Sequence, residues 1–217
     1  MQVSKAIHRR IEESELIIFD LDGTLVDTEK VAIVVMNQYL ESLQIVPTND
    51  LEEVFAGYSS YEAIKRLKER FPIEKSEAEI AQDLSTRYHA ALEGGIPAIP
   101  AAVEVVHYVA DRKRVAIVSG KVTAAMGIRE RFERVFGVDE YKISKPDPTG
   151  YRYCATELDV DPAKCVVFED TKVGVLSAKG AEMYVVGINY ASAGKQDLSG
   201  ADVVIESLQT LYGDWQS

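Results

Sequence analysis

The sequence predicts an α/β fold in which a doubly wound parallel sheet carries an inserted helical segment. Three observations predict it: short apolar runs, helical patterns between them, and one unusually long interval after the first run. Because the runs are continuous rather than alternating, they are typical of parallel strands covered by helices on both faces. They span residues 16–19, 115–118, 165–168 and 184–188, with a weaker candidate at 202–205.

Length and charge set the limits of this fold. The chain has 217 residues, 24 Lys and Arg against 35 Asp and Glu, and a net charge of −11. This length fits one large domain, or one domain with an insertion, that needs no disulfide or metal to hold its core. The acidic balance argues against a protein that binds nucleic acid by neutralising phosphates, and it disfavours an anionic membrane surface.

Cysteine content and hydropathy narrow the class further. Cys154 and Cys165 are too few and too far apart for a zinc site or a disulfide framework, so we expect both in the core. The first 15 residues are polar, and no apolar run approaches the roughly 18 residues that span a bilayer. We therefore expect a soluble cytoplasmic protein. No feature indicates an oligomeric state, and a monomer is compatible with the composition.

The insertion lies between the first two predicted strands. They are separated by about 95 residues, whereas a simple crossover needs a dozen or so. We expect a helical cap over 28–95, with Asp27 as the N-cap of its first helix, and an α/β core formed by 1–27 and 96–217. The cap's apolar residues recur at helical spacing: Val31, Val34, Val35, Tyr39, Leu40 and Leu43, then Ile64, Leu67 and Phe71, then Ile80, Leu84, Tyr88 and Leu92.

Polar side chains follow the predicted strands at the points where the strands end. In open parallel sheets, ligands bind beyond the carboxyl ends of the strands, so these side chains should meet at one edge. Lys145 lies in the loop region between the second and third predicted strands. The residues at the strand ends are Asp20 and Asp22, Ser119 and Gly120, and Glu169 and Asp170.

The carboxylates of this edge predict a cation site. An extended chain directs Asp20 and Asp22 to the same side, and Gly23 frees the backbone to turn immediately afterwards. Together with Glu169 and Asp170 they would gather up to four negative charges, an arrangement that is stable only with bound protons or a cation. All-oxygen ligation favours Mg²⁺.

These residues suit phosphoryl transfer. A carboxylate that attacks a phosphate dianion meets like-charge repulsion, which a divalent ion and the ammonium of Lys145 would both reduce. Ser119 and Gly120 offer a hydroxyl and N–H groups to phosphate oxygens. Asp22 could protonate the leaving alcohol and later deprotonate water. The pattern predicts a phospho-aspartyl intermediate.

Four segments resemble motifs of the haloacid dehalogenase superfamily, in the order found there. The resemblance extends over nearly the whole chain and is greatest to the helical-cap subfamily I, which includes β-phosphoglucomutases and phosphoglycolate phosphatases. It implies a Rossmann-like core. The segments are 19–29, 115–120, 145–148 and 166–171, with Gly174 following the last.

The resemblance implies a role for each site residue. Asp20 would be the nucleophile and Asp22 the general acid and base. Asp170 would bind Mg²⁺ with Glu169 beside it, and the metal would also take the backbone carbonyl of Asp22. Ser119 and Lys145 would bind phosphate. The residues expected to contact substrate are Gly23, Thr24, Ser119, Gly120 and Lys145, with Tyr58 and Ser59 in the cap.

Some residues of this chain differ from the family pattern, and these differences favour one of the family's reactions. Members that cleave carbon–halogen or carbon–phosphorus bonds usually lack the acid that Asp22 supplies. The mutases typically carry a His where Ala32 stands and an Arg in the cap loop, and no Arg occurs in 55–62. A bisphosphate intermediate would therefore lack an evident cationic ligand. We expect hydrolysis of a small phosphate monoester, such as a sugar phosphate, with a β-phosphoglucomutase-like phosphosugar mutase as the alternative.

A non-enzymatic role is the second alternative. A signalling receiver also phosphorylates an Asp near Mg²⁺ on a doubly wound sheet. However, it carries that Asp on a later strand and needs only about half this length. A binding module that had lost catalysis would be expected to lack at least one of the chemical residues, and all of them are present here.

Overall fold

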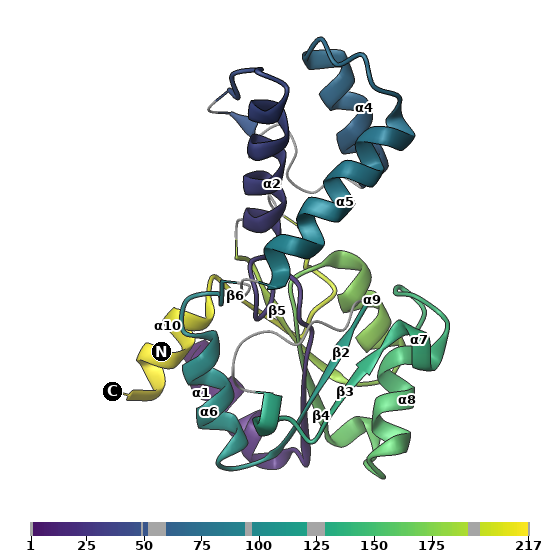
Figure 1. Cartoon of the computed structure of the whole chain (residues 1–217). Helices are drawn as coiled ribbons and strands as arrows, with labels where there is room; N and C mark the ends of the chain where they lie inside the picture. Colours follow the sequence, from purple (N-terminus) through teal and green to yellow (C-terminus); the bar gives the residue numbers. More distant parts are fainter. Residues whose placement is uncertain are drawn as a thin grey trace. The chain divides into compact units, whose positions relative to one another are not determined.

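A computed structural model describes most of the chain, and its elements are drawn in Figure 1. By contacts it divides into two compact units. One is an α/β unit formed by Met1–Val26, Ala98–Tyr190 and Lys195–Ser217, and the other is a helical unit built mainly from Asp27–Pro97. The described residues are 2–48, 50–51, 60–93, 97–120, 129–190 and 196–216.

The α/β unit contains a six-stranded sheet with the order β3-β2-β1-β4-β5-β6, and every neighbouring pair is parallel. The α/β class and all five predicted strands are confirmed, because each apolar run forms one strand or most of one. The strands are β1 (Leu16–Phe19), β2 (Arg114–Ser119), β3 (Arg134–Gly137), β4 (Cys165–Glu169), β5 (Tyr184–Ile188) and β6 (Val203–Ile205).

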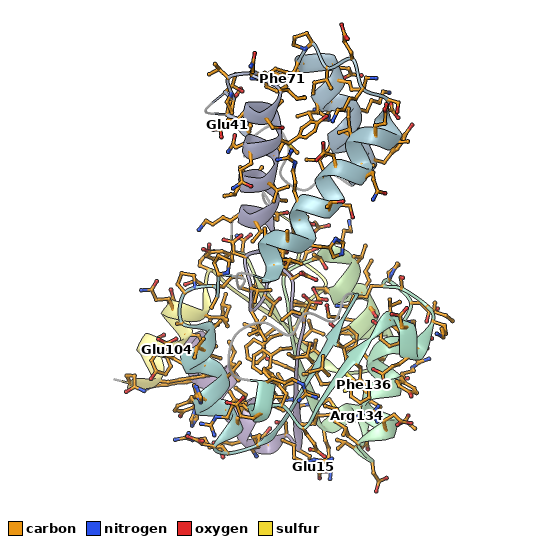
Figure 2. All side chains as sticks on the ribbon, viewed as in Figure 1. Glu15, Glu41, Phe71, Glu104, Arg134 and Phe136 are labelled. Carbon is orange, nitrogen blue, oxygen red and sulfur yellow. The ribbon has the colours of Figure 1, made fainter. Side chains whose placement is uncertain are left out.

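Strand β3 was not predicted. It is a four-residue edge strand that begins with a charged residue and ends with glycine, so it lacks the continuous apolar run that marks the other strands. Phe136 is nevertheless fully buried, and the guanidinium carbon of Arg134 lies 4.5 Å from the centroid of its ring. Figure 2 labels both side chains. An edge strand needs burial on fewer sides, and a single aromatic residue supplies it here.

Helices cover the sheet on both faces (Figure 1). One layer contains α1 (Gln2–Glu13), α6 (Ala102–Ala110) and α10 (Leu208–Gln216), which contact one another. The other contains α7 (Val138–Tyr141), α8 (Thr149–Glu157) and α9 (Lys172–Gly180). The short 3₁₀ turns are η1 (Arg129–Arg131) and η2 (Pro162–Lys164).

The polar N-terminal segment forms a helix that its composition did not predict. Helix α1 buries Ile7 and Ile11 completely, four residues apart on one face, and it contacts α10 and β6. Val3, Ile7 and Ile11 recur every four residues, which is a short periodic signal among so many charged residues. The prediction for the cysteines is confirmed, because Cys154 and Cys165 are both buried and free.

The helical unit contains α2 (Thr28–Ser42), α4 (Ser60–Arg70) and α5 (Glu77–Glu93). Asp27 is the N-cap of α2 as predicted, since its Oδ1 accepts a hydrogen bond of 3.1 Å from the backbone N–H of Lys30. The unit has its own apolar core. The buried members are Met36, Tyr39, Leu40, Leu51, Ile64, Leu67, Phe71, Ile73 and Ile80.

Among the described residues, every helix is too short or too polar to cross a bilayer.

Candidate active site

The sheet register brings the polar strand ends together in the α/β unit. Phe19, the last residue of β1, is in register with Ile117 of β2 and with Phe168 of β4. Asp20 therefore leaves the sheet beside the ends of both neighbouring strands. Its backbone N–H still donates to the carbonyl of Phe168 at 2.9 Å, which holds the start of the loop against β4.

Three carboxylates form a buried cluster at this edge. Asp20, Glu169 and Asp170 each place one carboxylate oxygen within 4.8 Å of the others. The exposed fractions of these residues are 7%, 0% and 5% respectively. So much negative charge in so small a buried volume requires positive charge or protons beside it.

Lys145 supplies the cation closest to this cluster. Its Nζ donates to Oδ1 of Asp20 and to Oε1 of Glu169, at 2.5 Å in each case. The loop that carries Lys145 is held at Asp147, whose carbonyl accepts a hydrogen bond of 2.6 Å from the buried hydroxyl of Ser177 on α9. The lysine side chain is 15% exposed, so its charge is only weakly screened by water.

The electrostatics of the cluster show that one ammonium does not balance three carboxylates. Burial raises the pKa of Asp20 to about 8; Lys145 opposes this rise and Glu169 adds to it. Burial, then the charges of Asp20 and Glu169, raise the pKa of Asp170 as well. Burial alone would lower the pKa of Lys145, but the two carboxylates that it contacts hold that pKa well above its usual value.

This donor set fits a magnesium ion. Mg²⁺ prefers carboxylate and carbonyl oxygens, and the cluster offers three carboxylate groups within reach of one ion. Burial, and then the neighbouring carboxylates, raise the pKa values of Asp20 and Asp170, so a divalent cation would favour their ionised forms.

Two residues of the first loop shape the position of Asp170. Gly23 has a φ of +82°, and a Cβ at this position would lie 2.1 Å from Oδ2 of Asp170. A side chain is therefore excluded by both conformation and space. The buried hydroxyl of Thr24 donates to Oδ1 of Asp170 at 3.0 Å. Thr24 thus touches the carboxylate cluster.

The side chain of Asp22 takes a different place from that of Asp20. It is half-buried, and its Oδ2 accepts a hydrogen bond of 3.4 Å from the hydroxyl of Ser119. Ser119 is fully buried at the end of β2, and its carbonyl accepts a hydrogen bond of 3.2 Å from the hydroxyl of Tyr141. Gly120 follows as an exposed residue. The two predicted cap contacts, Tyr58 and Ser59, lie outside the described residues.

The family comparison agrees with this geometry. The model of the family described as haloacid dehalogenase-like hydrolase matches residues 17–188, which include every site residue discussed above. The chain belongs to this family. Within the family it is close to the β-phosphoglucomutase and phosphoglycolate phosphatase subfamily.

Individual proteins resemble this chain over most of its length. Hexitol phosphatase A of Escherichia coli (strain K12) is 31% identical over 206 residues, covering 89% of this chain and 91% of the relative. The phosphorylated carbohydrates phosphatase of Thermotoga maritima is 31% identical over 177 residues, with coverages of 77% and 81%. The crystal structure of CbbY from Rhodobacter sphaeroides in complex with phosphate has a TM-score of 0.67, 25% identity, and coverages of 91% and 96%.

Two tyrosines of the site were missed by the sequence analysis. Tyr141 holds the carbonyl of Ser119, and Tyr151 of α8 donates to Oε1 of Glu169 at 3.0 Å. Neither residue lies at the end of a strand, where we expected the site residues of this haloacid dehalogenase-like hydrolase. The signal available was position: Tyr151 follows Lys145 by six residues and lies in the first turn of α8.

Proposed function

We propose that this haloacid dehalogenase-like hydrolase is a Mg²⁺-dependent phosphatase that cleaves small phosphate monoesters through a phospho-aspartyl intermediate on Asp20. One observation carries the proposal. A lysine ammonium 2.5 Å from Asp20 lies within a buried carboxylate cluster that lacks positive charge. A phosphate dianion entering beside Asp20 would need this arrangement of one nucleophilic oxygen and neighbouring cations.

The first step would form the intermediate. A carboxylate oxygen of Asp20 attacks the phosphorus, and the bond between phosphorus and the ester oxygen breaks. The departing alkoxide takes a proton from the carboxyl group of Asp22, so a neutral alcohol leaves and an acyl phosphate remains on Asp20.

The second step would release orthophosphate. A water oxygen attacks the same phosphorus while the carboxylate of Asp22 accepts one of its protons. The bond between phosphorus and Asp20 then breaks, which restores ionised Asp20 and protonated Asp22. The half-buried position of Asp22 suits this role, because a general acid and base must reach both buried reactants and water.

Lys145 and Ser119 would orient the phosphoryl group. The ammonium of Lys145 would donate to a phosphoryl oxygen while keeping Asp20 in place, and the hydroxyl of Ser119 would donate to another. Gly23, Thr24 and Gly120 would line the same group. Their contribution is positioning, which accounts for a large share of phosphoryl-transfer catalysis.

The metal would be held by Asp20, Asp170 and the backbone carbonyl of Asp22, with Glu169 beside them. When bound, Mg²⁺ would supply positive charge next to both the attacking carboxylate and the phosphate.

We place the substrate among sugar and polyol phosphates. Two relatives at 31% identity are named for hexitol and carbohydrate phosphates. Residues 28–95 would act as a cap domain on a core formed by 1–27 and 96–217, restricting access to small esters, with Tyr58 and Ser59 contacting the substrate. Rapid dephosphorylation of a folded phosphoprotein would count against this cap.

Phosphate release from a panel of small esters, with and without Mg²⁺, tests the proposal. We expect release that requires the metal and falls by about 10⁴-fold or more in Asp20→Asn. Asp161→Asn is the matched control, because Asp161 caps the turn η2 and asparagine caps equally well. Metal-independent release, or an active Asp20→Asn protein, would overturn the proposal.

The identity of the product separates hydrolysis from the mutase alternative. We expect ³¹P NMR to show orthophosphate and the dephosphorylated alcohol. An isomeric sugar phosphate as the main product, formed in the presence of a bisphosphate primer, would identify a mutase instead.

A further inference from the structure

Tyr151 makes two contacts with the charged cluster from inside the core. Tyr151 lies on α8 and is fully buried, and its hydroxyl donates to Oε1 of Glu169 at 3.0 Å. The same Oε1 accepts from Nζ of Lys145 at 2.5 Å, and that Nζ lies 5.0 Å from the centroid of the tyrosine ring. One side chain therefore touches both members of the Lys145–Glu169 pair.

Packing alone does not account for the hydroxyl. Phenylalanine would fill nearly the same volume in the core, and burying a hydroxyl is unfavourable unless it forms a hydrogen bond. The bond that Tyr151 forms is to a carboxylate, and hydrogen bonds to charged groups are the stronger class.

Glu169 in turn is fixed along both of its oxygens. Oε2 accepts from the backbone N–H groups of Asp170 and Thr171 and from the Thr171 hydroxyl, each at 3.0 Å. Oε1 accepts from Lys145 and Tyr151. Oε2 is fixed by the loop that follows β4. The position of the Lys145 ammonium therefore depends on the hydrogen bonds that Oε1 accepts.

We propose that Tyr151 is a positioning residue that fixes the ammonium of Lys145, through the shared Oε1 of Glu169 and through its own ring. The inference rests on the proposed function, in which Lys145 binds the phosphoryl group. A lysine side chain has many rotamers, and ordering it before the substrate arrives removes that entropic cost from binding and from the chemical step. A ring face within about 6 Å of the ammonium adds a favourable contact on the side away from solvent.

The test compares Tyr151→Phe with Tyr153→Phe. Tyr153 lies on the same helix, and its ring packs against Phe136 at 5.7 Å, so its variant controls for losing a hydroxyl from α8. We expect Tyr151→Phe to lower kcat/KM by about tenfold and to weaken the binding of orthophosphate, measured by calorimetry in the presence of Mg²⁺. Tyr153→Phe should match the unmodified protein in both.

A double-mutant cycle tests whether the effect passes through Lys145. In a Lys145→Met background, Tyr151→Phe should cause no further loss of orthophosphate affinity, because the group that it positions is gone. Losses that simply add would overturn the inference. A merely structural role would lower the unfolding temperature of Tyr151→Phe while leaving orthophosphate affinity and kcat/KM unchanged for the folded protein, and that result would overturn it as well.

These outcomes are distinct from failure of the proposed function. If the unmodified protein releases no phosphate from any ester, the proposed function is wrong. The positioning inference is then judged by the orthophosphate affinities of the same four proteins with Mg²⁺, in which the losses from the Tyr151 and Lys145 changes should be non-additive; additive losses, or no binding by the unmodified protein, would overturn it. If the protein is an active phosphatase and Tyr151→Phe equals it, only the positioning inference is wrong.

Discussion

Two charged clusters, one in each unit, differ in burial and in their balance of charge. In the helical unit, Asp83 accepts from Arg87 at 2.7 Å and from Lys75 at 3.0 Å, and these side chains are 26%, 33% and 41% exposed. The bonds from Arg87 and then Lys75 lower the pKa of Asp83. One carboxylate has two cationic donors, and all three side chains are partly hydrated, so this cluster requires no further positive charge.

The cluster in the α/β unit has the opposite character. Its three carboxylates are buried, Lys145 is the lysine that contacts them among the described residues, and two of the three have raised pKa values. Such an arrangement lowers the stability of the metal-free protein and leaves a strong demand for a cation. Unmatched buried charge, rather than the number of ion pairs, therefore distinguishes the candidate active site.

Removal of one lysine from each cluster should have the most unequal effects on activity. Lys145→Met should lower kcat/KM by roughly 10³-fold, because it removes a cation from the phosphoryl site. Lys75→Met should leave kcat/KM within about twofold, and should change the unfolding free energy by about 1 kcal/mol or less. Steady-state kinetics and urea denaturation of the two variants measure both effects. Equal losses of activity would contradict the distinction.

The pH dependence of metal-free stability should also separate the clusters. Asp20 has a folded-state pKa of about 8, above its unfolded value, so its carboxyl contributes stability while protonated and loses it as pH rises from about 4 to 8. Asp170 shifts in the same direction. We expect the unfolding free energy in EDTA to fall across this range, by up to about 1.4 kcal/mol per pH unit for each proton.

Asp20→Asn provides the control for that titration. The variant keeps the shape of the side chain but has no carboxyl to titrate, so its stability should fall less steeply with pH. Mg²⁺ should stabilise the unmodified protein most at pH 8, where the cluster is most negative. A stability that rises with pH between 5 and 8 in EDTA would contradict the assigned electrostatics.

A smaller effect is expected from two glycine substitutions. A Cβ at Gly174 would lie 1.7 Å from Oε1 of Glu169, so Gly174→Ala must displace that carboxylate, at a cost of about 1–3 kcal/mol and most of the activity. Gly213 lies inside α10 with open space around it, so Gly213→Ala should stabilise by about 0.5–1 kcal/mol. Thermal unfolding of both variants checks the contrast, and a harmless Gly174→Ala would show that Glu169 is not tightly held.

The smallest expected effect concerns a buried tyrosine in the helical unit. Among the described residues, the hydroxyl of Tyr39 is buried without a hydrogen-bond partner, whereas that of Tyr151 donates to Glu169. Tyr39→Phe should therefore be neutral or stabilising by up to about 1 kcal/mol, because it removes an unsatisfied group. Urea denaturation beside Tyr151→Phe measures the difference. Equal changes in the unfolding free energy would contradict this difference between the two hydroxyls.

Sequence reasoning reached the features that depend on local pattern. The continuous apolar runs predicted five strands, and the strand-end rule placed Asp20, Glu169 and Asp170 at one edge, where the structure has them. It failed where burial comes from tertiary packing. Two of the four residues of β3, Phe136 and Gly137, are buried, and α1 buries two isoleucines among many charged residues.

The side chains that support the site also depend on tertiary contacts, which local sequence patterns do not predict. The bond from Tyr151 to Glu169 joins residues 18 positions apart, through a hydroxyl whose partner no periodicity reveals. The steric need for Gly174 likewise depends on a side chain from the preceding strand. The catalytic roles of Asp20, Asp22, Ser119 and Lys145 remain predictions for experiment.

The central claim is that Asp20 becomes phosphorylated during turnover. The direct measurement is rapid acid quenching of Asp22→Asn protein with Mg²⁺ and a ³²P-labelled nitrophenyl ester, whose phenolate leaves without a proton from Asp22, followed by peptide mass mapping. We predict close to one phosphate per chain on the peptide containing Asp20, removed by hydroxylamine and absent from Asp20→Asn. Turnover by the unmodified protein with no hydroxylamine-sensitive label on that peptide in the Asp22→Asn protein would contradict the account.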